Sequence, residues 1–468
     1  MDDKEGQSLG DFGASFKGFL DQMAAQVPAQ EPVFLTRLRA HFSAEPTTFP
    51  IVAEEFEPPD HPNVQRALES YFQERNCSTE LLGITGDHMF AFGVISLAQL
   101  IKAGPSGLWG SGAPVTEGPV QYLNIPLEGD RVIACVQCGL YLVVEGDRRL
   151  VVLVNRPAEM GFGRKIKIEV MAADPAQAEA FLAEVRTLIR KCNVYRSHVL
   201  SLTVDPQGAM KVQFHRLPVI APDQIILPEG LLSRIERQTI GFGKHSRQLA
   251  AMGRHLKRGL LLHGAPGTGK TLTAMYLASQ MRERTVLLLT GRGMGLIEQS
   301  CAMARLLQPS IVVLEDVDLI AEERTREGAC AAVLFELLNQ MDGLSDDADI
   351  LFLLTTNRPD ILEPALASRP GRIDQAIEIP LPDAACRRLL LALYSRGLTM
   401  QLTQTEQFVT RTEGASAAFI RELLRKAALF AADEMNDAPV VMDHHVEDAM
   451  HELVVAGGEL TKSLLGVR

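Results

Sequence analysis

Residues 259–275, GLLLHGAPGTGKTLTAM, constrain the fold of this 468-residue chain more than any other stretch. The apolar start predicts a buried strand, the glycine-rich middle a tight turn, and the end the first turns of a helix. Within it, GAPGTGKT has the spacing G-x-x-x-x-G-K-[ST], in which backbone N–H groups and a helix N-terminus face a chain of phosphates. The sequence therefore predicts an α/β fold built around a site for a nucleoside triphosphate.

The residue types of this loop predict separate roles. Gly264, Gly267 and Gly269 allow the backbone to curl around the β-phosphate. Lys270 is expected to reach the β- and γ-phosphates, and Thr271 is expected to bind Mg²⁺. The predicted nucleotide-binding residues of the loop are Gly264, Ala265, Pro266, Gly267, Thr268, Gly269, Lys270, Thr271 and Leu272.

The run IVVLEDVD, residues 311–318, predicts a second strand of the same sheet, because it is continuously apolar until two acids follow. In such strands the first acid holds Mg²⁺ through water, and the second orients the water that attacks the γ-phosphate. The usual order is Asp before Glu, whereas here Glu315 precedes Asp316. Both carboxylates are present, so we expect a working site in which Glu315 serves the metal. Asp316 is expected to polarise the water less closely, because its side chain is shorter.

A third segment, residues 350–374, completes the predicted site. Its apolar half, ILFLLTT, predicts another buried strand, and Asn357 at the end of that strand is expected to fix the attacking water. Arg369 and Arg372 follow in the sequence RPGR. A guanidinium is planar and permanently charged, so we expect these arginines to reach the γ-phosphate bound by a neighbouring subunit.

In this order, the segments resemble the AAA clade of the AAA+ ATPases. The resemblance implies a P-loop ATPase core with a small helical lid, Walker A and Walker B motifs, arginine fingers, and hydrolysis of ATP with Mg²⁺ between the subunits of a homohexameric ring. It also implies work on a protein client and an adenine pocket near Ile240 and Gly241. The matching pieces lie between residue 222 and about residue 456, and they are GAPGTGKT, IVVLEDVD, LLTTNRPD, RPGRID and TEGASAAFIRELLRKAALFA.

Three departures from the family pattern limit what this resemblance implies. The reversed acidic pair is similar to that of the mitochondrial AAA translocase that moves the folded Rieske protein. The aromatic–hydrophobic–Gly tripeptide of the family's central pore has no match, and Met294-Gly295 is the nearest substitute. The segment PALASRPGR is one residue longer than the common spacing, which leaves open whether Arg369 or Arg372 contacts nucleotide.

The length of the chain predicts more than one domain. Residues 1–30 are expected to be a flexible segment or one short helix. Residues 31–217 mix helical and strand patterns and end in the hairpin pattern HVLSLTVDPQGAMKVQFH, which predicts an α+β domain that recognises a client or adaptor. The large ATPase subdomain is expected at residues 218–380, and the helical lid with a C-terminal helix at residues 381–468.

Composition disfavours several classes of protein. The net charge of −12 makes nucleic acid a poor partner. No apolar run reaches the roughly 18 residues that a membrane span needs. The start, MDDKEGQSLG, is acidic where a targeting signal would be basic or hydrophobic. Seven scattered cysteines suit a reducing compartment, so we expect a cytoplasmic protein without a membrane span.

Two further patterns allow metal chemistry, although a structural role is favoured for both. Cys135 and Cys138 form a CxxC in a strand-like run, and no second pair accompanies them, which favours buried strand cysteines. His444, Asp448 and His451 fall on one face of a helical pattern, where a solvated helix surface is favoured over a metal triad.

The predicted ATPase leaves more than one function open. We expect a ring-forming protein remodeller or translocase. The alternative from another class is a regulatory module whose nucleotide-dependent assembly signals to a partner. A membrane-anchored protease is a third possibility for this clade, but the sequence contains no HExxH. Remodelling of nucleic acid is a minor option, because RHLKR at residues 254–258 is favoured as a charged turn before the first core strand.

Overall fold

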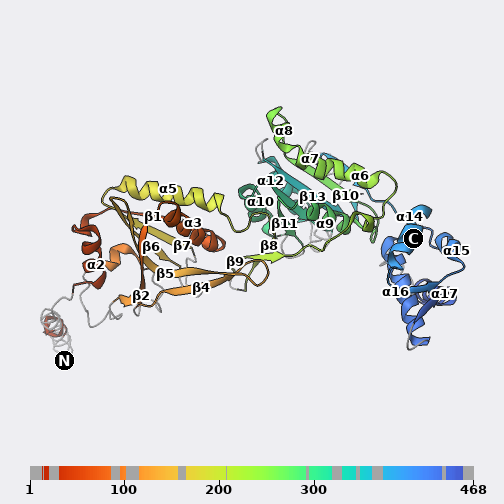
Figure 1. The fold of residues 1–468 in the computed structure, drawn as a ribbon, viewed down its shortest axis with the longest axis horizontal. Coiled ribbons are helices and arrows are strands. Elements are labelled where there is room, and N and C mark those ends of the chain that lie inside the picture. The colour runs from red at the N-terminus through yellow and green to blue at the C-terminus, as the bar shows by residue number, and fades with distance from the viewer. Residues whose placement is uncertain are drawn as a thin grey trace, which may run out of the picture. The chain divides into compact units, whose positions relative to one another are not determined.

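The computed structural model divides the chain into two compact units (Figure 1). The first comprises Met1–Val194 and Val204–Lys211, and the second comprises Tyr195–Thr203 and Val212–Arg468. The structure describes residues 13, 15–19, 31–85, 95–101, 115–156, 165–206, 208–290, 295–318, 329–343, 348–360, 373–434 and 439–456.

The first unit contains a seven-stranded antiparallel sheet with the order β1-β7-β6-β5-β2-β3, and β4 also pairs with β5. Its longest pairing is the β5–β6 hairpin, in which Glu145 lies opposite Arg148. The two-residue loop between them contains Gly146, whose φ of 58° suits the mirror-image turns that match the twist of a hairpin. The strands are β1 (Ile51–Phe56), β2 (Ser78–Thr85), β3 (Thr116–Gly118), β4 (Gln121–Pro126), β5 (Val132–Glu145), β6 (Arg148–Asn155) and β7 (Ile166–Met171).

Both faces of this sheet are buried against helices. Val152 and Val154 of β6 pack in one core with α3 and α5, whereas Val151 and Leu153 pack in another with α2 and α4. The split follows from the period of two in a strand, and each fully buried side chain of this size contributes roughly 1.5–3 kcal/mol relative to exposure. The α+β fold predicted for this part is confirmed. Its helices are α2 (Val33–Phe42), α3 (His61–Glu74), α4 (Leu97–Leu100) and α5 (Pro175–Lys191).

Cys135 and Cys138 lie within β5, where both side chains are buried. Burial raises the pKa of Cys135 to about 12 and that of Cys138 to about 11. The thiolate, which is the form that binds metal or attacks a disulfide, is therefore disfavoured at both positions.

The second unit contains a seven-stranded sheet with the order β14-β10-β13-β12-β11-β8-β9, and every pairing from β14 to β8 is parallel. Every residue of β12 and β13 is buried, as expected for strands covered on both faces. The α/β core predicted from the sequence is confirmed. The strands are β8 (Val199–Val204), β9 (Met210–His215), β10 (Arg258–His263), β11 (Thr285–Leu289), β12 (Ser310–Leu314), β13 (Ile350–Thr356) and β14 (Gln375–Glu378).

The prediction places the hairpin of β8 and β9 in the N-terminal domain that ends at residue 217, whereas the structure divides it: Val204–Lys211 belongs to the first unit and the remainder to the second. Val199 and Leu200 of β8 pair in parallel with Val286 and Leu287 of β11, so the hairpin extends the sheet of the second unit. The pairing satisfies the backbone groups along the edge of β11 that would otherwise be free.

Helices surround the second sheet and continue into a C-terminal helical region (Figure 1). The predicted small helical lid corresponds to α14 through α17, together with the short parallel pair β15 (Thr399–Gln401) and β16 (Val440–Met442). The helices are α6 (Leu231–Glu236), α7 (Phe242–Lys244), α8 (Ser246–Ala251), α9 (Lys270–Gln280), α10 (Ile297–Leu306), α12 (Ala329–Asp342), α14 (Ala384–Tyr394), α15 (Thr405–Arg411), α16 (Ala417–Glu434) and α17 (Asp443–His451), with π-helical turns at Arg237–Gly241 and Glu452–Ala456.

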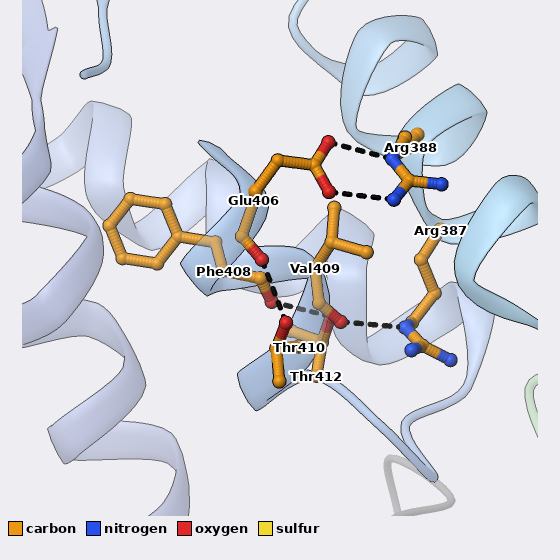
Figure 2. Close-up of polar contacts among 7 residues, drawn as sticks. All are labelled: Arg387, Arg388, Glu406, Phe408, Val409, Thr410 and Thr412. Atoms are coloured by element: carbon orange, nitrogen blue, oxygen red, sulfur yellow. Dashed lines mark hydrogen bonds and ion pairs between the residues drawn. The ribbon is translucent and has the colours of Figure 1, made fainter. Parts of the chain in front are cut away.

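Two neighbouring arginines of α14 form hydrogen bonds and an ion pair with α15 (Figure 2). The buried Arg387 donates to the carbonyl oxygens of Val409, at 2.9 Å, and Pro382, at 2.8 Å. The exposed Arg388 forms a bidentate ion pair with Glu406, at 2.7 and 2.6 Å. Because exposed ion pairs contribute little, we attribute the stability of this corner mainly to Arg387.

Candidate active site

The glycine-rich loop follows β10 and leads directly into α9, as the sequence predicts. Gly264 has φ of 145°, and a Cβ atom there would lie 2.2 Å from the carbonyl oxygen of Ile379. Gly267 has φ of 75°, and a Cβ atom there would lie 2.7 Å from Ser416 Oγ and 2.9 Å from Ala418 Cβ. Only glycine fits at these two positions, because both the backbone angle and the close neighbours exclude a side chain.

Lys270 is the first residue of α9 and is only 5% exposed. Its Nζ donates to the carbonyl oxygens of Gly264, at 3.0 Å, and Ala265, at 2.8 Å, which holds the ammonium group inside the loop. Burial lowers the pKa of Lys270, and the charges of Asp316 and Asp318 oppose that shift. The loop thus holds a cation where phosphate charge is expected to bind.

A cavity of about 900 Å³ opens beside this loop, a size typical of small-molecule sites. Its lining brings together most of the predicted loop residues with Asp316, Asn357 and the lid. Gly264, Ala265 and Glu315 are not part of the lining. Arg369 and Arg372 lie outside the described residues, as does Met294. The predicted residues that line the cavity are Pro266, Gly267, Thr268, Gly269, Lys270, Thr271, Leu272, Asp316 and Asn357.

The structure does not bring Ile240 and Gly241 to this cavity. Ile240 packs against the hydrophobic core of the second unit, and Gly241 ends a π-helical turn. The apolar wall of the cavity comes instead from the chain before α6 and from α14 of the lid. The sequence reasoning missed this wall, although four of its large aliphatic residues lie close together in residues 218–228 and were a usable signal. The apolar wall residues are Pro218, Ile220, Ile225, Ile226, Leu227, Leu390 and Tyr394.

The lid contacts the phosphate loop at the start of α16. The backbone N–H of Ala418 donates to the carbonyl oxygen of Gly267 at 3.1 Å. Ala417, Ala418 and Arg421 of the same helix also line the cavity. A ligand in the cavity would therefore contact the core and the lid together.

Glu315 and Asp316 follow β12 but have different surroundings. Glu315 is half-buried, and among the described residues its buried Oε1 has no hydrogen-bond partner. Burial raises the pKa of Glu315, and the neighbouring Asp316 raises it further. A buried carboxylate oxygen without a partner suits a hard cation, and Thr271 adds a hydroxyl at the cavity. These oxygen donors fit Mg²⁺.

Asp316 has a left-handed backbone with φ of 46°, which is uncommon for a residue other than glycine. Its N–H donates to Thr355 Oγ1 at 3.0 Å, and its Oδ1 accepts a hydrogen bond from Asn357 Nδ2 at 3.3 Å. Burial raises the pKa of Asp316, the charge of Asp318 raises it further, and Lys270 and Asn357 oppose the shift. A carboxylate facing the cavity and bonded to Asn357 is placed to accept a proton from water.

Asp318 is a residue of this site that sequence reasoning missed. Its carboxylate is only 4% exposed and accepts hydrogen bonds from Thr356 Oγ1 at 2.8 Å and from the N–H of Asn357 at 3.1 Å. The third acid in the spacing E-D-x-D of residues 315–318 was the signal available for finding it.

A second acidic and histidine cluster, Glu434, His444 and His445, lies in the lid and has spacing that a metal could use. His445 Nδ1 accepts a hydrogen bond from the N–H of Met442 at 3.0 Å. Nε2 of the neutral ring must then carry the proton, which it donates to Glu434, so that atom has no lone pair for a metal. Within the part of the chain that the structure describes, Asp448 and His451 do not join this cluster.

Comparisons with known proteins agree with the geometry of the second unit. Residues 260–381 match the sequence model of the ATPase family associated with various cellular activities (AAA). This stretch runs from within β10 past β14 and includes the glycine-rich loop and the strands β12 and β13. It forms an AAA ATPase domain.

Several curated proteins resemble this AAA domain over part of their length. The 26S proteasome regulatory subunit 10B homolog A of Arabidopsis thaliana is 36% identical over 188 residues, which are 37% of this chain and 47% of the relative. The proteasome-activating nucleotidase of Methanocaldococcus jannaschii is 32% identical over 214 residues, 43% of this chain and 49% of the relative. The ATP-dependent zinc metalloprotease FtsH of Acaryochloris marina is 31% identical over 244 residues, 49% of this chain and 37% of the relative. The chain thus spans about half or less of the length of these relatives.

Among the residues that the structure describes, no helix combines the length and the apolar character that crossing a bilayer requires.

Proposed function

We propose that this chain hydrolyses ATP to ADP and phosphate and, as a homohexameric ring, remodels or moves a protein client that its N-terminal unit recognises. The observation that carries the proposal is the meeting of Lys270, Asp316 and Asn357 in one cavity that the lid also lines. The AAA match and the proteasomal names of several relatives support action on proteins.

The proposed mechanism divides the hydrolysis among residues that line the cavity and Glu315, which precedes Asp316 in the chain. Lys270 and the loop N–H groups bind the phosphates, while the apolar wall contacts the adenine base of ATP. Glu315 and Thr271 would hold Mg²⁺, which supplies neutralising charge on the β- and γ-phosphates when bound. Asp316 orients the attacking water and takes up its proton, and Asn357 fixes both Asp316 and the water.

Assembly into a ring is proposed from the arginines that follow β13. Arg369 and Arg372 would reach the γ-phosphate in a neighbouring subunit and stabilise the charge of the transition state. Under this proposal a single subunit has an incomplete active site, and hydrolysis is a property of the interface.

We predict that Arg369→Ala and Arg372→Ala each bind ATP but hydrolyse it poorly. Arginines supplied in this way contribute about 10³- to 10⁵-fold to the rate in related phosphoryl transfers, so even partial loss is measurable as phosphate release. Mixing either variant with Lys270→Ala subunits should restore some turnover, because hybrid interfaces combine an intact loop with an intact arginine. As a control, subunits that carry both the arginine change and Lys270→Ala should restore no turnover when they are mixed with the arginine variant. An unmixed monomer that turns over ATP at the full rate would contradict the ring.

We propose that the first unit mainly determines which client is bound and transmits force to it. Aromatic side chains in a pore provide a large contact area with a client chain at low entropic cost. At the nearest substitute for the family's pore tripeptide this sequence has Met294, whose side chain is softer and more flexible. A weaker grip on an unfolded chain favours a client that is moved largely folded. The alternative function is a regulatory ATPase, in which assembly on ATP signals to a partner without mechanical work.

Capture with an ATP-locked variant tests this part of the proposal. Asp316→Asn with ATP should retain a protein that the same variant with ADP releases, and adding that protein to the wild type should raise phosphate release. Met294→Ala should have a mild effect on this stimulation. A captured protein that leaves turnover unchanged would support the regulatory alternative. Progressive unfolding of the captured protein from one end, stopped by Met294→Ala, would show threading instead.

A further inference from the structure

We infer that Asp318 is a positioning residue for ATP hydrolysis, which holds Asn357 and, through it, Asp316 at the cavity. The inference rests on the proposed ATPase function. Asp318 itself does not line the cavity, so it acts through its neighbours and not by touching the nucleotide.

The carboxylate of Asp318 is the endpoint of hydrogen bonds from two consecutive residues at the end of β13. Its Oδ1 accepts from Thr356 Oγ1 at 2.8 Å and from the N–H of Asn357 at 3.1 Å. Thr356 Oγ1 in turn accepts from the N–H of Arg358 at 3.0 Å. One buried oxygen therefore fixes the backbone at the end of β13 and at Asn357, which lines the cavity.

The same two segments are joined at three more points. Asp316 donates its N–H to Thr355 Oγ1 at 3.0 Å, and Val317 donates its N–H to Thr355 O at 3.0 Å. Asn357 Nδ2 donates to Asp316 Oδ1 at 3.3 Å. These bonds hold Asp316 in its left-handed conformation, with φ of 46°, so the direction of its carboxylate depends on the placement of β13.

The burial of Asp318 makes this arrangement sensitive to its removal. With the side chain only 4% exposed, water cannot readily replace the carboxylate. Asp318→Ala would leave the N–H of Asn357 and the hydroxyl of Thr356 without an acceptor. Asp318→Asn keeps an oxygen that can accept both bonds but loses the charge that strengthens them. A graded effect, with alanine worse than asparagine, is therefore expected.

The test measures kcat, KM and the affinity for a fluorescent ATP analogue in the full chain. Asp318→Ala should lower kcat about 10- to 100-fold, the range seen when outer partners of metal-site ligands are lost, while nucleotide affinity stays near the wild-type value. Asp318→Asn should recover part of the loss. Thr356→Val, which removes one of the two donors, should give an intermediate loss. The matched control is Thr412→Val, because Thr412 is also buried and donates to a backbone carbonyl, that of Phe408, in the lid (Figure 2).

A double-mutant cycle separates positioning from a general loss of structure. If Asp318 acts through Asn357, then Asp318→Ala should add little to the loss caused by Asn357→Ala. Full additivity in this cycle, or equal losses of kcat in Thr356→Val and Thr412→Val, would overturn the inference. If Asp318→Ala does not fold, the comparison of the two threonine variants decides alone. A wild-type chain without ATPase activity would instead contradict the proposed function.

Discussion

Lys270→Ala is expected to abolish measurable ATP turnover while both units keep their folds. Lys270 makes its two described hydrogen bonds to carbonyl oxygens of its own loop, and its side chain is a buried cation beside the cavity. Removing a buried charge with so few partners should cost little stability, but it removes a donor aimed at the charge of the transition state. Loss of one such donor costs at least about 10²- to 10³-fold in rate.

The measurement is steady-state phosphate release, with thermal melting to confirm the fold. Lys257→Ala provides a matched control, because Lys257 Nζ also donates to a backbone carbonyl, that of Met341 at 3.0 Å, yet Lys257 is not part of the cavity lining. The control should retain wild-type turnover. Wild-type turnover in Lys270→Ala would show that the cavity is not the site of hydrolysis.

The parts of the site that sequence predicts well are those written in short, continuous stretches. The loop from Gly264 to Lys270 needs glycines at fixed spacings for its backbone geometry, so its pattern is readable without any knowledge of the fold. The strands β12 and β13 are likewise visible, because full burial on both faces demands an uninterrupted apolar run.

The parts that sequence could not predict depend on contacts between distant segments. The apolar wall of the cavity combines Ile226 with Leu390 and Tyr394, which are more than 150 positions further along the chain. No local period marks such a wall. The placement of β8 beside β11 is similar, since a hairpin pattern predicts the pairing of its own strands but not which sheet edge it joins.

Asp318 illustrates a different limit of sequence reasoning. The sequence shows that residue 318 is acidic. Its role, however, depends on whether the carboxylate points to the cavity or to the end of β13. The left-handed backbone of Asp316 redirects the chain, and Asp318 then lies under the end of β13 and not at the cavity. A motif gives the residue types, whereas the backbone angle at one position decides which of them face the ligand.

Asp316→Asn is expected to bind ATP and stall, because it preserves the fold and the metal ligand but loses the carboxylate that takes the proton from water. The asparagine can still accept the hydrogen bond from Asn357 through its amide oxygen, so the variant tests charge and basicity more than shape. General-base catalysis typically contributes about 10²- to 10⁴-fold, and kcat should fall by that amount while nucleotide affinity is retained.

Glu315→Gln is the matched variant, because the two acids are adjacent and differ in what surrounds them. Glu315 is absent from the cavity lining, and its buried Oε1 has no hydrogen-bond partner among the residues that the structure describes, so its amide variant should weaken the response to Mg²⁺. Titrating Mg²⁺ at fixed ATP should therefore shift the half-saturating concentration for Glu315→Gln and leave it nearly unchanged for Asp316→Asn. If Glu315→Gln instead stalls with ATP bound while Asp316→Asn turns over, the roles of the two acids are reversed. Glu315, the first acid, would then orient the attacking water, and Asp316, the second, would hold Mg²⁺. The two roles would follow the residue types and not the order of the acids in the sequence.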